Sequence, residues 1–213
     1  MIPDLVIFDC DGVIVDSEGP TCDAIAKNLT GYGFPLDRNG VHDLFVGQTL
    51  HDIHRAGRER GLDLPDDWVR ELYAEMFEVL GQGVPVSAGV IELFDALEGQ
   101  GTRIAIASNG AIDKMRVTLS PHGLFDRLSD RMYSGHVHDP KPKAGMLIAA
   151  MEQANAAPER TVMIDDSAAG AGAAAAAGTH FIGYSEHGGA EKLAPLGVDI
   201  AYSMAELRAK LIK

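Results

Sequence analysis

Polar residues follow three apolar runs of the chain, and their types and spacing suit metal-assisted chemistry. The three clusters are Asp9-Cys10-Asp11-Gly12, Ser108-Asn109 and Asp165-Asp166. Four carboxylates brought to one place would repel one another strongly unless a cation lay among them. Hard oxygen ligands of this kind suit Mg²⁺, which also bridges to the oxygens of a phosphate group. The clusters therefore predict a magnesium site that uses Asp9, Asp11, Asp165 and Asp166, provided that the fold brings them together.

The apolar runs that precede these clusters are typical of buried parallel strands. Residues 5–8, 103–107 and 161–164 are almost entirely apolar, as expected for strands that helices cover on both faces. Shorter strand candidates lie at 180–182 and 198–201. Helical patterns between and after these runs span residues 90–100, 111–119, 145–155, 168–177 and 204–211. This alternation predicts an α/β fold with a Rossmann-like parallel sheet. Ligands of such sheets bind at the carboxyl ends of the strands, so the three clusters are expected to meet there.

The stretch from residue 17 to residue 85 interrupts this alternation. It contains no convincing strand, and its patterns indicate helices over residues 21–29, 51–60 and 66–80. We therefore predict an inserted α-helical cap domain over residues 17–85. Residues 1–16 and 86–213 would form the α/β core.

Composition narrows the class of partner. The formal net charge is −13, which argues against a nucleic-acid polymer or an anionic membrane surface. A small phosphorylated metabolite is compatible with this charge, because it responds mainly to charges within about 8 to 10 Å. The site should then supply local positive charge. With two cysteines, no long apolar segment and no secretory leader in view, a reduced cytoplasmic setting is expected.

The clusters, taken in order, resemble the motifs of the haloacid dehalogenase superfamily. Phe8–Val13 resembles the first motif, a DxDG box after a buried strand, and Ser108 resembles the second. Lys141, followed by Pro142, resembles the third motif, and Asp165-Asp166 the fourth. The usual continuation of the third motif is replaced by Lys143-Ala144-Gly145. Lys143 is therefore the alternative lysine, and Lys141 is preferred for its Lys-Pro context.

The resemblance implies a role for each motif residue. Asp9 would be the nucleophile that forms an aspartyl-phosphate, and Asp11 would be the general acid and base. Ser108, Asn109 and Lys141 would bind the phosphate. Asp9, Asp166 and the backbone carbonyl of Asp11 would hold Mg²⁺, with Asp165 as a further ligand or as support for the others.

Together these features predict a magnesium-dependent phosphatase that acts on a small soluble phosphoester. The inserted cap resembles that of phosphoglycolate phosphatases and β-phosphoglucomutase-like enzymes. A sugar-phosphate mutase is therefore the main alternative, although Thr21 stands where such mutases carry a hinge histidine. A non-catalytic phosphate-binding relative is a further alternative. Residues 45–49 lie about where relatives carry a substrate-specificity loop. The charged stretch 51–58 could face an anionic substrate, but a solvent-exposed helix face is the preferred interpretation.

A dinucleotide-binding protein is a rival interpretation. Gly170, Gly172 and Ala175 formally fit the pattern G-x-G-x-x-A after a strand. However, Asp165-Asp166 occupies the turn where a pyrophosphate would lie. The small residues are more simply explained by close packing of a helix on the sheet.

Overall fold

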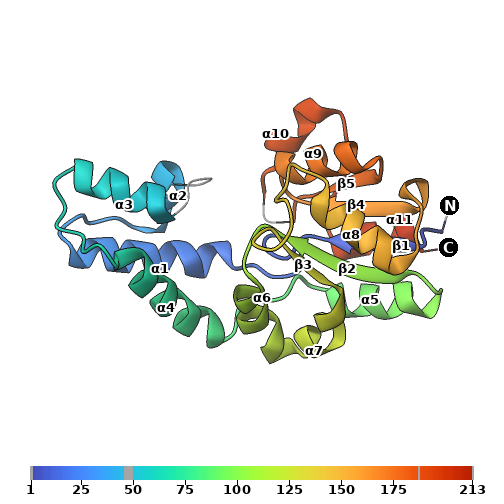
Figure 1. Ribbon diagram of the computed structural model, residues 1–213, viewed down its shortest axis with the longest axis horizontal. Coiled ribbons are helices and arrows are strands. Elements are labelled where there is room, and N and C mark those ends of the chain that lie inside the picture. Colours follow the sequence, from blue (N-terminus) through green and yellow to red (C-terminus); the bar gives the residue numbers. More distant parts are fainter. Residues whose placement is uncertain (1, 46–49, 187, 213) are drawn as a thin grey trace. The chain divides into compact units, whose positions relative to one another are not determined.

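The computed structural model describes residues 2–45, 50–186 and 188–212, and it divides into two compact units (Figure 1). The first unit comprises Met1–Asp16 and Pro85–Lys213, and the second comprises Ser17–Val84. Within the described residues, no helix is long and apolar enough to cross a membrane.

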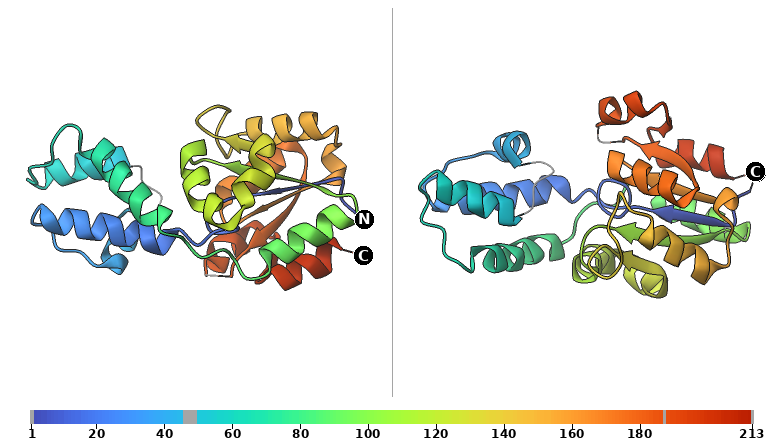
Figure 2. Two further views of the ribbon diagram at one scale, coloured as in Figure 1. Left: turned by 90° about the horizontal axis from the view of Figure 1, so that it is seen from below. Right: turned by 45° about the horizontal axis from the view of Figure 1, so that its top comes forward.

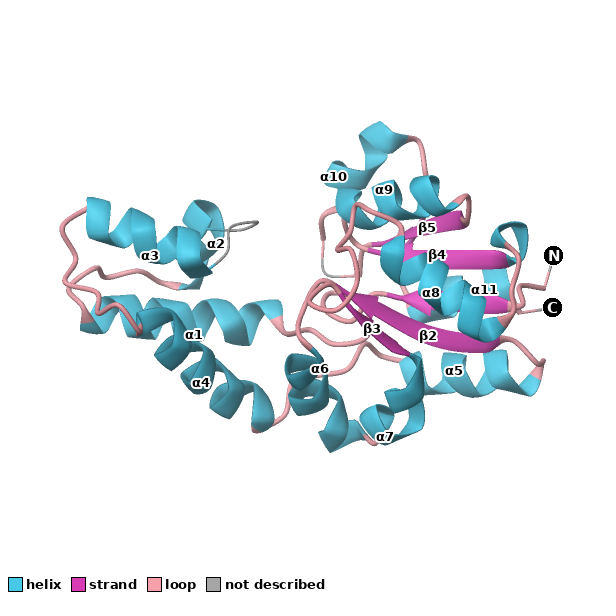
Figure 3. Cartoon of the chain, viewed as in Figure 1, coloured by secondary structure: helices cyan, strands magenta, loops and turns pink. Residues whose placement is uncertain are grey.

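The first unit is an α/β domain built on one sheet, as predicted. Its strands are β1 (Leu5–Phe8), β2 (Arg103–Ser108), β3 (Met132–Ser134), β4 (Thr161–Asp165), β5 (His180–Tyr184) and β6 (Asp199–Ala201). They lie in the order β3-β2-β1-β4-β5-β6, and every neighbouring pair is parallel. Figure 3 shows the strands of this sheet in magenta. In the central strand, Phe8 pairs with Ile106 on one side and Ile164 on the other. The residues that follow these strands therefore emerge at the same edge of the sheet.

Helices cover both faces of this sheet, which explains why the central strands are mainly apolar. The helices are α5 (Val90–Gly99), α6 (Ile112–Leu119), α7 (Leu124–Leu128), α8 (Gly145–Ala154), α9 (Ala168–Ala177), α10 (Ala190–Leu193) and α11 (Met204–Leu211). Leu5 and Ile7 belong to a buried cluster with residues of α8 and α9. Phe8 points the other way, and its ring lies 4.9 Å from that of Phe94 in α5. The two helical layers are visible on either side of the strands in Figure 2.

Within the first unit, backbone hydrogen bonds join the segment 13–16 to the segment 85–87. Val15 forms an antiparallel bridge with Val86, and Asp16 N donates to Pro85 O at 3.0 Å. Ser87 N donates to Ile14 O at 2.9 Å, and its hydroxyl donates to Val13 O at 2.6 Å. These bonds fix the segment that directly follows Asp11.

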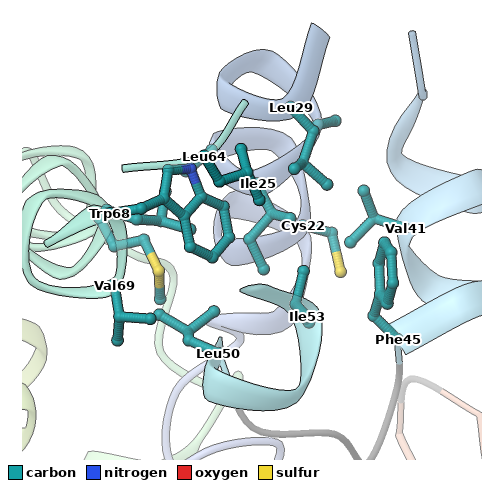
Figure 4. Close-up of a cluster of buried hydrophobic side chains, with 14 residues drawn as sticks. Cys22, Ile25, Leu29, Val41, Phe45, Leu50, Ile53, Leu64, Trp68 and Val69 are labelled. Carbon is teal, nitrogen blue, oxygen red and sulfur yellow. The ribbon is translucent and has the colours of Figure 1, made fainter. Parts of the chain in front are cut away.

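The second unit consists of helices α1 (Glu18–Gly31), α2 (Arg38–Phe45), α3 (Leu50–Glu59) and α4 (Trp68–Gly81). Their apolar faces form one core around Trp68 (Figure 4). The Trp68 indole donates to Asn28 Oδ1 at 2.8 Å and stacks on His54 with ring centres 5.7 Å apart. Of the predicted specificity loop, Phe45 packs in this core, and residues 46–49 lie outside the described part of the chain.

The packing of the second unit predicts the effect of a cavity in it. Leu72→Ala removes a fully buried side chain and should lower the free energy of unfolding by about 2–5 kcal/mol. Trp68 is the only tryptophan in the chain, so its fluorescence during urea titration reports the unfolding of this unit. The matched control is Leu44→Ala, because the Leu44 side chain is 41% exposed and its loss should cost less than about 0.5 kcal/mol. Equal losses in both variants would contradict this packing.

Candidate active site

Asp9 stands directly after β1, at the carboxyl edge of the sheet. Its backbone N–H donates to Ile164 O at 2.9 Å, which continues the pairing of β1 with β4 for one residue. The residue is only 9% exposed. Cys10, the next residue, is buried as a free thiol. The strand pairing therefore fixes the backbone of the predicted nucleophile.

Lys141 reaches Asp9 from the segment between β3 and α8. Its Nζ lies 2.8 Å from Asp9 Oδ1 and 2.6 Å from Asp165 Oδ2, and its side chain is 3% exposed. Burial alone would lower the pKa of Lys141, but the charges of Asp9 and Asp165 raise it above its usual range. Lys143 instead pairs with Asp139 at 3.0 Å and is 67% exposed. Of the two candidate lysines, Lys141 is the one that contacts the carboxylates.

Burial has the largest effect on the pKa of the Asp9 carboxyl group. Loss of water raises its pKa to about 8, although Lys141 opposes the shift, and the charge of Asp165 adds to it. The metal-free site is therefore short of positive charge. A divalent cation beside these carboxylates would favour the ionised form of Asp9.

Asp165 is fully buried and has partners for both carboxylate oxygens. Oδ2 accepts from Lys141, and Oδ1 accepts from the Ser167 backbone N–H at 2.9 Å and from its hydroxyl at 2.5 Å. A Cβ added at Gly170 would lie 2.0 Å from Asp165 Cγ, so only glycine leaves room for this carboxylate. Gly172 likewise lies against Pro142, with an added Cβ 2.9 Å from its Cβ. The glycines of the supposed dinucleotide motif thus have a packing role.

Asp166 completes a group of three carboxylates. One oxygen each of Asp9, Asp165 and Asp166 can be chosen so that all lie within 4.8 Å of one another. Asp166 also closely approaches Gly12, where an added Cβ would lie 2.1 Å from Asp166 Oδ2. Gly12 has φ +79°, a left-handed conformation that glycine adopts without strain. The turn after Asp11 thus needs glycine for both its conformation and its contact.

Ser108 and Asn109 follow β2 at the same edge. Ser108 is buried, and its hydroxyl accepts from Gly110 N at 3.1 Å. The Asn109 side chain bonds to the backbone of Lys141 in both directions: Oδ1 accepts from Lys141 N at 2.8 Å, and Nδ2 donates to Lys141 O at 3.1 Å. Asn109 therefore holds the segment that carries Lys141.

Asp11 has a cationic partner that the sequence reasoning missed. Lys114 Nζ in α6 lies 2.8 Å from Asp11 Oδ1. Burial would lower the pKa of Lys114, but the charge of Asp11 and its hydrogen bond raise it. Nothing local in the sequence points to this pair, because the two residues lie about a hundred positions apart in the chain.

The charges of the site fit a divalent cation. Asp9, Asp11, Asp165 and Asp166 carry four negative charges when ionised, and Lys141 and Lys114 contribute two positive ones. The remaining two negative charges and the all-oxygen donor set match Mg²⁺.

Removal of the Lys141 charge should destabilise the metal-free protein. Lys141→Met leaves Asp9 and Asp165 buried without their cation, which should cost about 3–5 kcal/mol. Thermal unfolding without metal measures this loss, and Lys143→Met is the matched control. Added Mg²⁺ should raise the Tm of Lys141→Met more than that of the parent, since the ion supplies the missing charge. A Lys143→Met loss as large as that of Lys141→Met would contradict the assignment.

Comparison with known proteins agrees with this geometry. Residues 3–178 match the family described as haloacid dehalogenase-like hydrolase. The 6-phosphogluconate phosphatase of Escherichia coli is 28% identical over 169 residues, covering 78% of this chain and 75% of its own. The phosphoglycolate phosphatase of Rhodospirillum rubrum is 27% identical over 205 residues, covering 92% and 85%.

A solved structure shows the same fold over nearly the whole chain. A haloacid dehalogenase family hydrolase from Deinococcus radiodurans, determined with bound phosphate and sodium, has a TM-score of 0.83 and 30% identity. The match covers 98% of this chain and 94% of that one. With the family match spanning most of the sequence, this chain belongs to the haloacid dehalogenase-like hydrolases, with a helical unit inserted after the first strand.

Proposed function

We propose that this hydrolase is a magnesium-dependent phosphatase that cleaves a small soluble phosphoester through an aspartyl-phosphate on Asp9. The observation that carries the proposal is the placement of Asp9. It is a buried carboxylate in contact with Lys141, and it lies beside the carboxylates of Asp165 and Asp166. With Lys141 and a metal ion beside it, such a carboxylate can approach an anionic phosphoryl group despite the charge of both.

The reaction has two steps at phosphorus. In the first, an Asp9 carboxylate oxygen attacks the phosphorus atom, the bond to the leaving oxygen breaks, and Asp11 donates its proton to that oxygen. In the second, Asp11 accepts a proton from water, whose oxygen attacks the same phosphorus atom. The Asp9–phosphorus bond breaks, inorganic phosphate leaves, and both aspartates return to their starting forms.

The metal would be held by Asp9, Asp166 and the backbone carbonyl of Asp11, with Asp165 in support. When bound, Mg²⁺ supplies positive charge that offsets the repulsion between Asp9 and the phosphate and the charge that develops on the phosphoryl oxygens. Lys141 contributes positive charge to the same end. It also keeps Asp9 and Asp165 together.

Phosphate binding falls to Ser108 and Lys141. The buried Ser108 hydroxyl accepts a hydrogen bond from Gly110 N, and a hydroxyl that accepts can still donate its own hydrogen to a phosphate oxygen. The Asn109 side chain is hydrogen-bonded to the backbone of Lys141. We therefore propose that Asn109 supports phosphate binding indirectly, by holding Lys141 in position.

The substrate class follows from the relatives. Their names include 6-phosphogluconate phosphatase, phosphoglycolate phosphatase and phosphorylated carbohydrates phosphatase. All are consistent with a small phosphorylated metabolite as the partner of this chain.

Asp9→Asn tests the nucleophile. We expect kcat to fall by at least about 10³-fold, because the amide does not attack phosphorus. Circular dichroism should show an intact fold. The same variant should raise the Tm of the metal-free protein, and more so at about pH 8 than at about pH 5.

The sign of this pH dependence follows from the raised pKa of Asp9. The native carboxyl holds its proton up to about pH 8, whereas the ordinary value is 3.8, so its contribution to stability falls as pH rises between these values. The amide of Asp9→Asn does not ionise, so the variant does not lose this stability as pH rises. Near-parent turnover in Asp9→Asn would refute the nucleophile assignment, and a Tm that falls most at high pH would refute the charge argument.

Phosphate release from a substrate panel tests the reaction class. The panel contains 6-phosphogluconate, 2-phosphoglycolate, glucose 6-phosphate and p-nitrophenyl phosphate, each assayed with Mg²⁺ and with EDTA. We expect Mg²⁺-dependent release that EDTA abolishes and that added Mg²⁺ restores. Interconversion of hexose phosphates without net release would instead support the mutase alternative. Binding of phosphate without either reaction would support the non-catalytic alternative.

A further inference from the structure

Asp11 of the first motif forms an ion pair with Lys114, a residue outside all four motifs. Lys114 lies in the first turn of α6, and Asp11 lies on the turn after β1. Their charged atoms are 2.8 Å apart, and the side chains are 22% and 30% exposed. The pair is therefore partly shielded from water, so salt and solvent weaken it less than they weaken a surface pair.

Gly110 shows what surrounds this pair. A Cβ placed on Gly110 would lie 3.3 Å from Ser108 Oγ, 3.7 Å from Lys114 Cδ and 3.8 Å from Asp11 Oδ2. The three side chains therefore converge on one small space beside the Gly110 backbone. Lys114 runs along this space and reaches the Asp11 oxygen, so the Asp11 carboxylate lies on the same side as the phosphate-binding hydroxyl of Ser108.

We propose that Lys114 is a positioning residue, which holds the Asp11 carboxylate beside Ser108 for proton transfer at the leaving oxygen. This inference rests on the proposed function, in which Asp11 is the acid and base. The carboxylate of an aspartate on a turn can rotate about two side-chain bonds. A general acid must lie within hydrogen-bond reach of the oxygen that it protonates, and small displacements are costly in rate.

The location of Lys114 supports this role over a purely structural one. Its ammonium group sits in the first helical turn of α6, where the helix dipole disfavours a cation. Arg116, in the same helix, pairs with Asp113 at 3.2 Å and is 58% exposed. Arg116 thus pairs within its own helix, whereas Lys114 pairs with Asp11 at the carboxyl edge of the sheet, a contact that stabilisation of α6 alone does not require.

The test compares leaving groups in single-turnover experiments, which isolate the transfer of phosphate to Asp9. Lys114→Met should slow this step by about 10- to 100-fold for the fastest alkyl phosphate of the panel, because an alkoxide needs a proton to leave. For p-nitrophenyl phosphate the loss should stay below about 3-fold, since p-nitrophenolate leaves without one. Lys114→Arg should recover most of the alkyl phosphate rate. Arg116→Met is the matched control and should change neither rate.

Two outcomes would overturn the inference. One is an equal loss for both substrates in Lys114→Met, which would indicate general damage to the site. The other is a loss of the same size when Lys114→Met is added to Asp11→Asn, since a residue that acts through Asp11 has little left to affect in that background. Failure of the proposed function has a different signature. In that case, Asp11→Asn itself would show no difference between leaving groups, or Asp9→Asn would keep its turnover.

Discussion

A single buried ammonium group, that of Lys141, holds the site together. It bonds to carboxylates that follow two neighbouring strands, Asp9 after β1 and Asp165 at the end of β4. At such separations each attraction amounts to about 6 kcal/mol at an effective dielectric constant of 20. Removal of each ion from water costs several kcal/mol, so one pair would barely break even. One ammonium serves two carboxylates here, and the raised pKa of Asp9 shows that it does not fully offset their burial. The segment that bears the ammonium must also be fixed, which the Asn109 side chain does.

The small residues around the site follow from this arrangement. A carboxylate as buried as that of Asp165 leaves no room for a side chain on the next helix, and Gly170 provides that room. Gly172 accommodates Pro142, the neighbour of Lys141, and Gly12 accommodates Asp166. A sequence pattern that looks like a dinucleotide fingerprint thus arises from close approach of backbone to carboxylate and proline. Glycine suits a dinucleotide site and these packing contacts alike, because in each case another group must approach the backbone more closely than a side chain would allow.

The fold could be predicted where a sequence pattern extends over many consecutive residues. The apolar runs of β1, β2 and β4 and the helix-rich stretch after β1 indicate an α/β core with an insert, and the motif residues lie at the strand ends as parallel topology requires. Short or interrupted elements escaped prediction: β3 has three residues, and α2 begins with Arg38-Asn39-Gly40, which reads as a turn. The choice between Lys141 and Lys143 depends on burial. The role of Lys114 depends on a contact across about a hundred residues of chain, which one sequence does not reveal.

The distribution of charge explains how so acidic a protein can receive an anion. The chain carries a net charge of −13, yet the carboxyl edge of its sheet gathers Lys141 and Lys114 among the aspartates. Beyond a Debye length of about 8 Å, at physiological salt, the remaining exposed charges are largely screened. With all four aspartates ionised, they and the two lysines sum to two negative charges, which one divalent cation cancels. The affinity for a phosphoester should therefore depend on the bound metal far more than on the net charge of the chain, because the metal acts beside the phosphate whereas the distant charges are screened.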